Sequence, residues 1–115
     1  MDNNCIFCKI IEKKVPSDLV AENEHVIAIK DISPKALIHI LIIPKKHIKN
    51  IISFEDQDFA FAGHIFKMAK FLSDKFENAK DFKLLINNGE LAGQAIFHLH
   101  MHFLAGENLA SLTKL

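Results

Sequence analysis

The sequence predicts one α+β domain, residues 1–115, with an antiparallel sheet of about five strands, a short N-terminal helix and one long helix. A chain of 115 residues has the length of one ordinary domain. Several short β-branched segments are joined by short connections, which favours antiparallel strand pairing. One longer stretch carries hydrophobic residues at steps of three and four, which is typical of a helix lying on a sheet.

The first half of the chain predicts a short helix followed by three strands. From Cys5 to Lys14 the isoleucines and a phenylalanine fit one apolar helix face, and Pro16 stops the helix. The next segments are short, rich in β-branched residues and separated by turn-forming residues. The predicted strands cover residues 19–22, 26–30 and 38–43, and the last of them ends at Pro44.

The second half predicts the long helix and two further strands. Ser53 followed by Asp56 resembles a capping box at a helix start. Hydrophobic residues then recur at helical spacing as far as about Asn78: Phe59, Ala62, Phe66, Ala69, Leu72 and Phe76. The two strands are predicted at 82–86 and 97–104, on either side of a loop that contains two glycines.

The composition excludes several classes of protein. Lysine plus arginine equals aspartate plus glutamate, 14 of each, so no basic surface for a nucleic-acid backbone is expected. The longest unbroken apolar run, residues 40–43, is far too short to span a membrane. The N-terminus is polar and lacks a signal-peptide pattern. With two cysteines and no disulfide framework, we expect a cytoplasmic protein.

Seven histidines are the unusual feature of the composition, and three of them alternate in the last predicted strand. Successive strand residues point to opposite faces, so His98, His100 and His102 would share one face, about 6.6 Å apart. Such a row could ligate a metal, or one neutral imidazole could attack phosphorus while its neighbours donate hydrogen bonds. A lone histidine on a strand is usually only packed or solvated, but that reading fits three in strict alternation poorly.

Two other groups of residues support a chemical role. The loop before the histidines contains Gly89 and Gly93, whose flexible backbone could cradle a phosphate, although a plain hairpin connection is an alternative. Cys5 and Cys8 form a Cys-x-x-Cys pair that could be a redox pair, half of a zinc site, or two small buried side chains. His25 and His64 are expected to be surface or packed residues.

The segment from His98 to Leu104 resembles the His-φ-His-φ-His-φ-φ signature of the histidine-triad (HIT) family. Other segments are similar to its Hint-like nucleoside phosphoramidase branch, and together they cover nearly the whole chain. These segments are residues 5–11, 31–34, 38–43, 44–48, 87–89 and 93–94.

The resemblance implies hydrolysis of nucleoside 5′-phosphoramidates or related derivatives, with purine favoured, through a covalent nucleotidyl-histidine. His100 would be the nucleophile and His102 would bind the phosphoryl oxygens. His39 would assist proton movement or orient His100, and Asp31 would contact the ribose. The implied catalytic and substrate-binding positions are His98, His100, His102, His39, Asp31, Ile32, Asn87, Gly93, Gln94 and Ala95.

The resemblance also bears on metal, partners and specificity. No cofactor is implied for catalysis, but bacterial relatives with the cysteine pair complete a structural zinc site at positions that match His47 and His98. A homodimer is implied, with the long helix and an edge strand in contact. Many relatives carry serine where this chain has Ala95, so slower turnover or a changed leaving-group preference is expected.

Two alternative functions remain open at the level of sequence. The histidine row could hold a catalytic zinc in a metal-dependent hydrolase, which would lose activity in chelator. The chain could instead be a nucleotide-binding regulatory protein whose catalysis is incidental.

Overall fold

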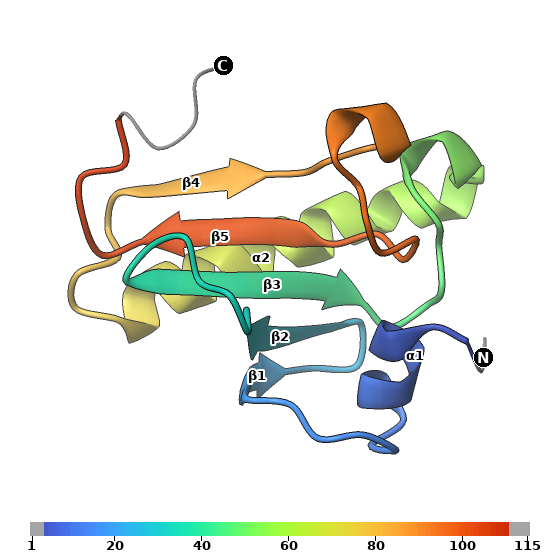
Figure 1. The fold of residues 1–115 in the computed structure, drawn as a ribbon, viewed down its shortest axis with the longest axis horizontal. Coiled ribbons are helices and arrows are strands. Elements are labelled where there is room, and N and C mark those ends of the chain that lie inside the picture. The colour runs from blue at the N-terminus through green and yellow to red at the C-terminus, as the bar shows by residue number, and fades with distance from the viewer. Residues whose placement is uncertain (1–3, 111–115) are drawn as a thin grey trace.

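The computed structural model describes residues 4–110. In this range the predicted α+β fold is confirmed: a five-stranded antiparallel sheet with one short and one long α-helix (Figure 1). The α-helices and strands are α1 Ile6–Ile11, β1 Leu19–Glu22, β2 Val26–Lys30, β3 Ile38–Pro44, α2 Ala60–Lys75, β4 Phe82–Leu85 and β5 Met101–Ala105. Three 3-10 turns lie at Ile51–Ser53, Asp56–Phe59 and Glu90–Ala92. No helix in the described part of the chain is long and apolar enough to cross a membrane.

The strands lie in the order β1-β2-β3-β5-β4, so that β3 and β5 are neighbours near the middle of the sheet (Figure 1). In the register between these two strands, Leu41 lies opposite His102 and His39 lies opposite Leu104. Opposed residues in an antiparallel pair share a face. His39 and His102 therefore project from the same side of the sheet.

Each face of the sheet is covered by a different helix, because strand side chains alternate between the faces. One face packs on the apolar stripe of α2 and includes Ile40, Ile42 and Phe103, all at most 1% exposed. The other face contributes Leu41 and Ile43 to a second cluster with α1. Because α1 is short and covers only one end of its face, part of that face remains open around the histidines.

The predicted boundaries of α1 and α2 require correction. The structure ends α1 at Ile11 rather than near Lys14, because Lys13 adopts a left-handed backbone conformation with φ of 63°. The predicted capping box at Ser53 and Asp56 is wrong by two residues. Glu55 and Asp58 form it instead, and they begin a 3-10 turn that continues into α2.

The predicted last strand is also too long at its start. Its hydrogen-bonded part begins at Met101, so His98 and His100 precede the strand and only His102 lies in it. The partner strand β3 ends at Pro44, and Leu99 N–H donates to the carbonyl of Ile48, beyond that proline, at 2.7 Å. The three histidines therefore occupy three different environments.

Candidate active site

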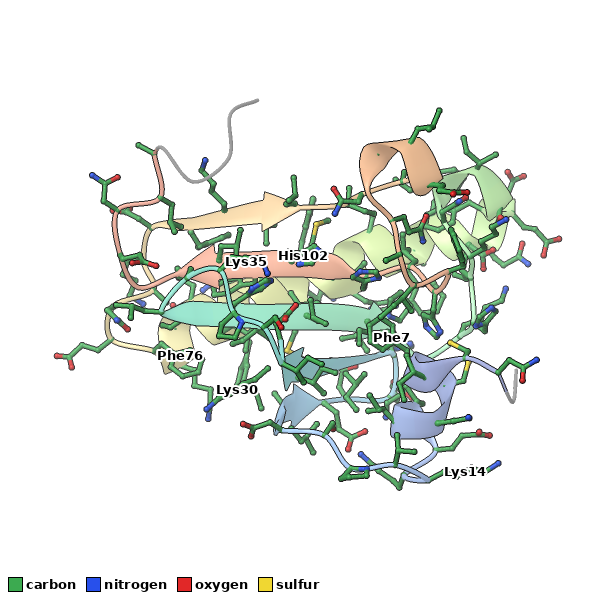
Figure 2. The ribbon with its side chains drawn as sticks, viewed as in Figure 1. Phe7, Lys14, Lys30, Lys35, Phe76 and His102 are labelled. Atoms are coloured by element: carbon green, nitrogen blue, oxygen red, sulfur yellow. The ribbon has the colours of Figure 1, made fainter. Side chains whose placement is uncertain are left out.

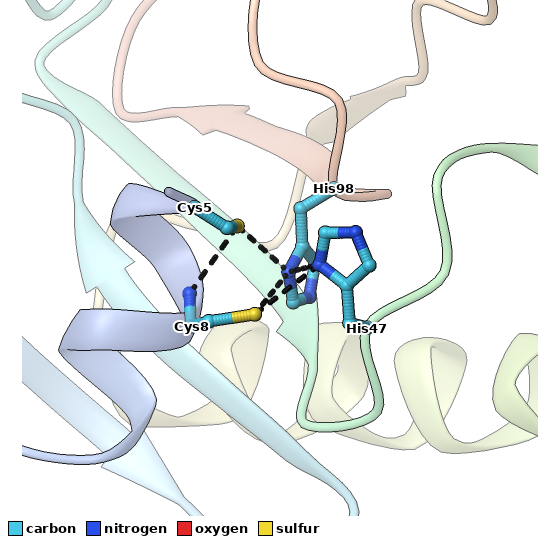
Figure 3. Close-up of side chains that lie close together, drawn as sticks. All are labelled: Cys5, Cys8, His47 and His98. Carbon is cyan, nitrogen blue, oxygen red and sulfur yellow. Dashed lines mark hydrogen bonds between the residues drawn. The ribbon is translucent and has the colours of Figure 1, made fainter. Parts of the chain in front are cut away.

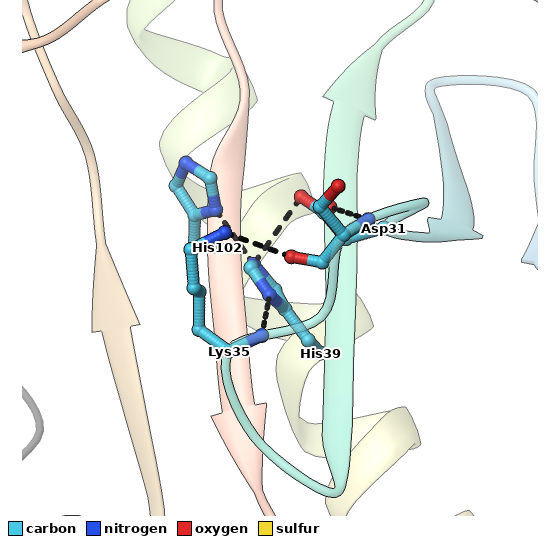
Figure 4. A network of polar contacts seen from close by, with 5 residues as sticks. Asp31, Lys35, His39 and His102 are labelled. Carbon is cyan, nitrogen blue, oxygen red and sulfur yellow. Dashed lines mark hydrogen bonds and ion pairs between the residues drawn. The ribbon is translucent and has the colours of Figure 1, made fainter.

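The structure brings His39, His102 and Asp31 together on the open face of the sheet (Figure 4). His39 projects from β3 and His102 from β5, while Asp31 follows β2. His39 Nε2 lies 2.9 Å from His102 Nδ1 and 3.5 Å from Asp31 Oδ2. The other oxygen of Asp31 accepts the Ser33 N–H at 2.7 Å. His39 thus contacts His102, whereas the sequence allowed for a contact with His100.

A backbone amide determines the tautomers of this pair. The Lys35 N–H donates to His39 Nδ1 at 3.0 Å, so that nitrogen must carry the lone pair. A neutral His39 then has its proton on Nε2 and donates it to Nδ1 of His102. His102 in turn keeps its own proton on Nε2, where it can be donated to an anionic oxygen.

His100 has the opposite arrangement. Its Nδ1 lies 2.8 Å from the carbonyl oxygen of His98, which can only accept, so the proton of neutral His100 is on Nδ1. The lone pair is therefore on Nε2. The His100 ring is 9% exposed and meets the edge of Phe7, with ring centroids 5.1 Å apart. His100 is therefore a neutral imidazole with a fixed position and a free lone pair on Nε2. The centroid of its ring lies 5.2 Å from the centroid of the His102 ring.

Burial keeps these histidines neutral. It lowers the pKa of His102 to about 4, with further lowering by repulsion from His100 and His39. Burial also lowers the pKa of His100 and of His39, and Asp31 opposes the shift at both. At neutral pH the site therefore holds the neutral imidazoles that a nucleophile and a hydrogen-bond donor of this kind require.

A cavity of about 350 Å³ opens beside His102. Of the predicted substrate-binding residues, Asp31 and Asn87 line it, together with Lys35, His39, Leu85, His102 and Leu104. Ile32 lies beside Asp31 and is 99% exposed. The cavity therefore contains both Asp31 and His102, the positions that the resemblance implies for ribose and phosphoryl contacts.

The glycine loop has an internal brace. Gly89 and Gly93 both have φ of 97°, a conformation that favours glycine. The side chain of Gln94 is buried and bonds to Gly89 N–H and to the carbonyls of Lys49 and Ile96. Any contact of Gln94 with substrate would therefore fall to its backbone.

The remaining predicted residues form a second cluster (Figure 3). Cys5, Cys8, His47 and His98 each direct one sulfur or nitrogen atom inward, and these four atoms lie within 4.8 Å of one another. The separations are 3.3 Å for Cys5 Sγ to His98 Nδ1, 3.2 Å for Cys8 Sγ to His47 Nδ1, and 3.1 Å between the two Nδ1 atoms. A tetrahedral zinc site with ordinary bond lengths has ligand atoms about 3.3–3.8 Å apart.

The donor chemistry of this cluster fits a metal. His98 Nε2 lies 2.8 Å from the Pro44 carbonyl and must donate to it, so the lone pair of neutral His98 is on Nδ1 and faces the cluster. A carbonyl that holds the outer nitrogen of a histidine is a common support of metal ligands. Burial lowers the pKa of His98 to about 4, which keeps Nδ1 free of a proton.

The group of Asp31, His39 and His102 does not direct free lone pairs toward a common centre in this way. A metal on His39 Nε2 would require the proton of the neutral ring on Nδ1, where the Lys35 N–H already donates. This geometry favours the hydrogen-bonded arrangement of His39 and His102 over metal binding at this pair. It argues against a metal held by Asp31, His39 and His102.

Two supporting residues were not identified as site residues from the sequence. Phe7 lies between the two cysteines, is 3% exposed, and places its ring edge-to-face against both His98 and His100. Lys35 lines the cavity and supplies the amide that orients His39. The apolar pattern assigned Phe7 only to a helix face, and no sequence signal distinguishes Lys35 from other exposed lysines.

Comparison with known proteins agrees with this geometry. The HIT domain model matches residues 12–109. Protein hit of Bacillus subtilis is 47% identical over 102 residues, which cover 88% of this chain and 70% of that protein. The HIT-like protein slr1234 of Synechocystis is 39% identical over 106 residues, which cover 92% and 93%.

Solved structures extend the similarity to the fold. A HIT family hydrolase from Clostridium thermocellum is 41% identical with a TM-score of 0.93, covering 100% of this chain and 99% of that one. A zinc-bound histidine triad protein from Mycobacterium smegmatis is 26% identical with a TM-score of 0.79, covering 95% and 79%. The site has three histidines before and within one strand and a fourth on the adjoining strand. Together with these relatives, this arrangement defines the class. The chain belongs to the HIT family.

Proposed function

We propose that this protein is a Hint-like hydrolase of nucleoside 5′-phosphoramidates or related nucleotide derivatives, preferably purine, and that it works through a nucleotidyl-histidine. The observation that carries the proposal is the tautomer of His100. The His98 carbonyl holds the proton of His100 on Nδ1, which leaves the Nε2 lone pair available for attack on phosphorus. The family relationship and the names of relatives as hydrolases support the same class of reaction.

In the proposed reaction, His100 Nε2 forms a bond to the α-phosphorus and the P–N bond to the leaving amine breaks. The amine takes up one proton from solvent as it leaves, and the phosphorylated His100 ring is cationic. Water then attacks the phosphorus, and the P–Nε2 bond breaks with its electron pair returning to His100. The nucleoside monophosphate and one proton are released, and His100 is again neutral. His102 stabilises the charge that develops on the phosphoryl oxygens, because its Nε2–H is available as a donor.

The other site residues are proposed to bind and orient. The carboxylate of Asp31 would accept hydrogen bonds from ribose hydroxyls, and Asn87 would supply a polar contact in the same cavity. His39 acts on the reaction through His102, whose tautomer it maintains.

A structural zinc is proposed at Cys5, Cys8, His47 and His98, because these donors match a closed tetrahedral site. When bound, the ion would supply cross-linking energy between α1 and the segments that carry the two histidines, and no catalytic chemistry. His98 belongs to both centres: its ring faces the cluster and its carbonyl holds His100.

The test is mass spectrometry of protein quenched during turnover of adenosine 5′-phosphoramidate. Wild type and the control His25→Ala should show a transient adduct with the mass of an AMP group, and His100→Ala should show none. His25 is a suitable control because it stacks on His64, with ring centroids 3.7 Å apart, outside both clusters.

Other outcomes would redirect the assignment. Turnover without an adduct, lost in chelator while the fold persists, would favour the metal-dependent hydrolase. Binding of AMP with neither adduct nor turnover would favour a nucleotide-binding regulatory protein.

A further inference from the structure

The cavity beside His102 extends beyond the reacting histidines. Its lining includes His102, Lys35, Leu85 and Asn87 but not His100. The side chains of Lys35 and His102 lie close together (Figures 2 and 4). The ring centroids of His100 and His102 are 5.2 Å apart, so a phosphoryl group bound by both would lie beside this cavity. The ribose is proposed to contact Asp31 and Asn87, which leaves Lys35 as the charged lining residue for the other substituent of the phosphoryl group.

The formal charges on the lining of this cavity are those of Asp31 and Lys35. The two lining histidines are neutral at neutral pH, because burial lowers their pKa values. The carboxylate of Asp31 already has the Ser33 N–H on one oxygen and His39 Nε2 near the other. The ammonium of Lys35 is thus the cationic group that the cavity offers to a ligand.

Lys35 is held at the cavity by hydrogen bonds to neutral groups and not by an anionic partner. Its N–H donates to His39 at 3.0 Å, and its Nζ donates to the exposed carbonyl oxygen of Ser33 at 2.9 Å (Figure 4). Within residues 4–110 no carboxylate pairs with Lys35. By contrast, Lys45 pairs with Glu22 and Lys46 pairs with Asp58. An anionic group is a stronger hydrogen-bond partner for an ammonium than a neutral carbonyl is. An anionic ligand can therefore replace the Ser33 carbonyl as the partner of Lys35 Nζ.

We propose that Lys35 binds a second anionic group of the substrate, a carboxylate or a phosphate carried by the leaving group. The base and ribose of a nucleoside are neutral, so in a simple nucleotide derivative this second charge lies on the leaving group. The preferred substrates are therefore nucleotides linked to an acidic leaving group, such as an amino acid bonded through its amine or a further phosphate. The inference rests on the proposed function and adds its substrate class.

The kinetic test compares two adenosine phosphoramidates that differ in one charge. One carries alanine, with a free carboxylate, and the other carries alaninamide. Lys35→Gln should lower kcat/KM for the alanine compound about threefold to tenfold and change the alaninamide compound less than twofold. Lys35→Arg should retain the preference for the carboxylate, and added salt should weaken it. Lys30→Gln, which alters an exposed lysine paired with Asp18, is the matched control.

A binding test separates phosphate from carboxylate and does not need turnover. In the His100→Ala background, the ratio of ADP to AMP affinity is measured with and without Lys35→Gln. A lower ratio in the double variant identifies an anion site that also accepts phosphate, whereas an effect confined to the alanine compound identifies a carboxylate site. Both results support Lys35 as the anion-binding residue.

Equal effects of Lys35→Gln on the alanine and alaninamide compounds, or no effect on either compound and on the ADP to AMP ratio, would overturn the proposal. Failure of the proposed function looks different. In that case wild type forms no adduct and turns over neither phosphoramidate, while the nucleotide affinities still report on Lys35.

Discussion

At the scale of single residues, the backbone assigns a different proton position to each histidine of the site. The Lys35 amide places the His39 proton on Nε2, the His98 carbonyl places the His100 proton on Nδ1, and the Pro44 carbonyl places the His98 proton on Nε2. Neutral imidazole has one donor and one acceptor, so each backbone contact determines what the other nitrogen can do. This explains how chemically identical side chains can differ in which nitrogen donates a hydrogen bond and which nitrogen offers a lone pair.

The first prediction concerns His39. Replacing it with leucine removes the donor to His102 Nδ1, and we expect the rate of adduct formation to fall about tenfold to a hundredfold. His39→Gln keeps an N–H donor and should lose less. Nitrogen NMR of labelled histidine would show whether the His102 tautomer becomes mixed. An unchanged tautomer together with a full loss of rate would contradict this positioning role.

Ala95 is the second residue with an expected effect on turnover. It borders a second cavity near Cys5, His47 and Phe97, on the side of the cluster of two cysteines and two histidines. Ala95→Ser adds a hydroxyl donor at this position, and we expect faster turnover of the alaninamide phosphoramidate by a few-fold or an altered preference among leaving amines. Steady-state kinetics on a series of amines is the measurement. Identical rate constants for every amine would contradict the expectation.

At the scale of elements, α1 connects the cysteine pair to His100. It begins at Cys5, whose sulfur accepts the Cys8 N–H, and it carries Phe7 against the rings of His98 and His100. The same His98 whose ring faces the cysteines holds His100 through its carbonyl. The cluster of cysteines and histidines is therefore placed to stabilise the position of His100.

The prediction for this element uses Cys8→Ser. We expect about one zinc per chain in wild type, weaker zinc retention in the variant, a lower Tm and slower adduct formation, because His98 is less firmly held. Zinc content, Tm and the adduct rate are measured on the same samples, with His25→Ala as the control. Full zinc content with unaltered stability in Cys8→Ser would exclude a metal role for the pair.

At the scale of the whole molecule, the edge of the sheet and the neighbouring helix present an apolar surface. β4 is an edge strand, and a groove between it and α2 is lined by Phe66, Ala69, Lys70, Ser73, Asp74, Phe82 and Leu84. Phe66 is 58% exposed. An unpaired edge strand beside exposed aromatic side chains favours strand addition. We propose that a second copy of the chain docks here, as the family resemblance implies.

The homodimer is tested by sedimentation of charge-introducing variants. Phe66→Asp should shift the mass from dimer to monomer. Phe71→Asp alters another exposed phenylalanine of α2 that does not line the groove, so it should leave the mass unchanged. A monomeric wild type, or equal effects of the two variants, would contradict the proposal.

Stability should depend on pH through the buried histidines. The pKa of His102 is about 4 in the folded protein and about 6.5 when unfolded. Between these values the unfolded chain binds a proton that the folded chain does not, so stability present above pH 6.5 is lost as the pH falls. We expect Tm to decrease from pH 7 to pH 4, and His102→Gln to make this decrease shallower at the same zinc concentration. An equal or steeper slope in the variant would contradict the assignment.

The sequence alone predicted the fold, because the fold depends on local patterns. The site residues were predictions from the family resemblance, and Phe7 and Lys35 were not among them. Strand alternation and helical periodicity report which side chains face a core, and the predicted layers and strand pairing type are confirmed. The boundaries that went wrong lie where a left-handed Lys13, the capping box at Glu55 and the end of β3–β5 pairing at Met101 override the hydrophobic pattern. A family signature likewise names residues without stating their geometry.

The tertiary structure decided what each histidine can do. One strand face for His98, His100 and His102 was the expectation, but the pairing of β3 with β5 stops at Ile42 and Met101. The chain before Met101 places two of these rings in other surroundings. The proton positions depend on donors and acceptors from Lys35, His98 and Pro44, backbone groups whose direction no side-chain pattern encodes. The order of residue types along the chain therefore indicates the fold and the family. The protonation and reactivity of the histidines depend on contacts between segments distant in sequence.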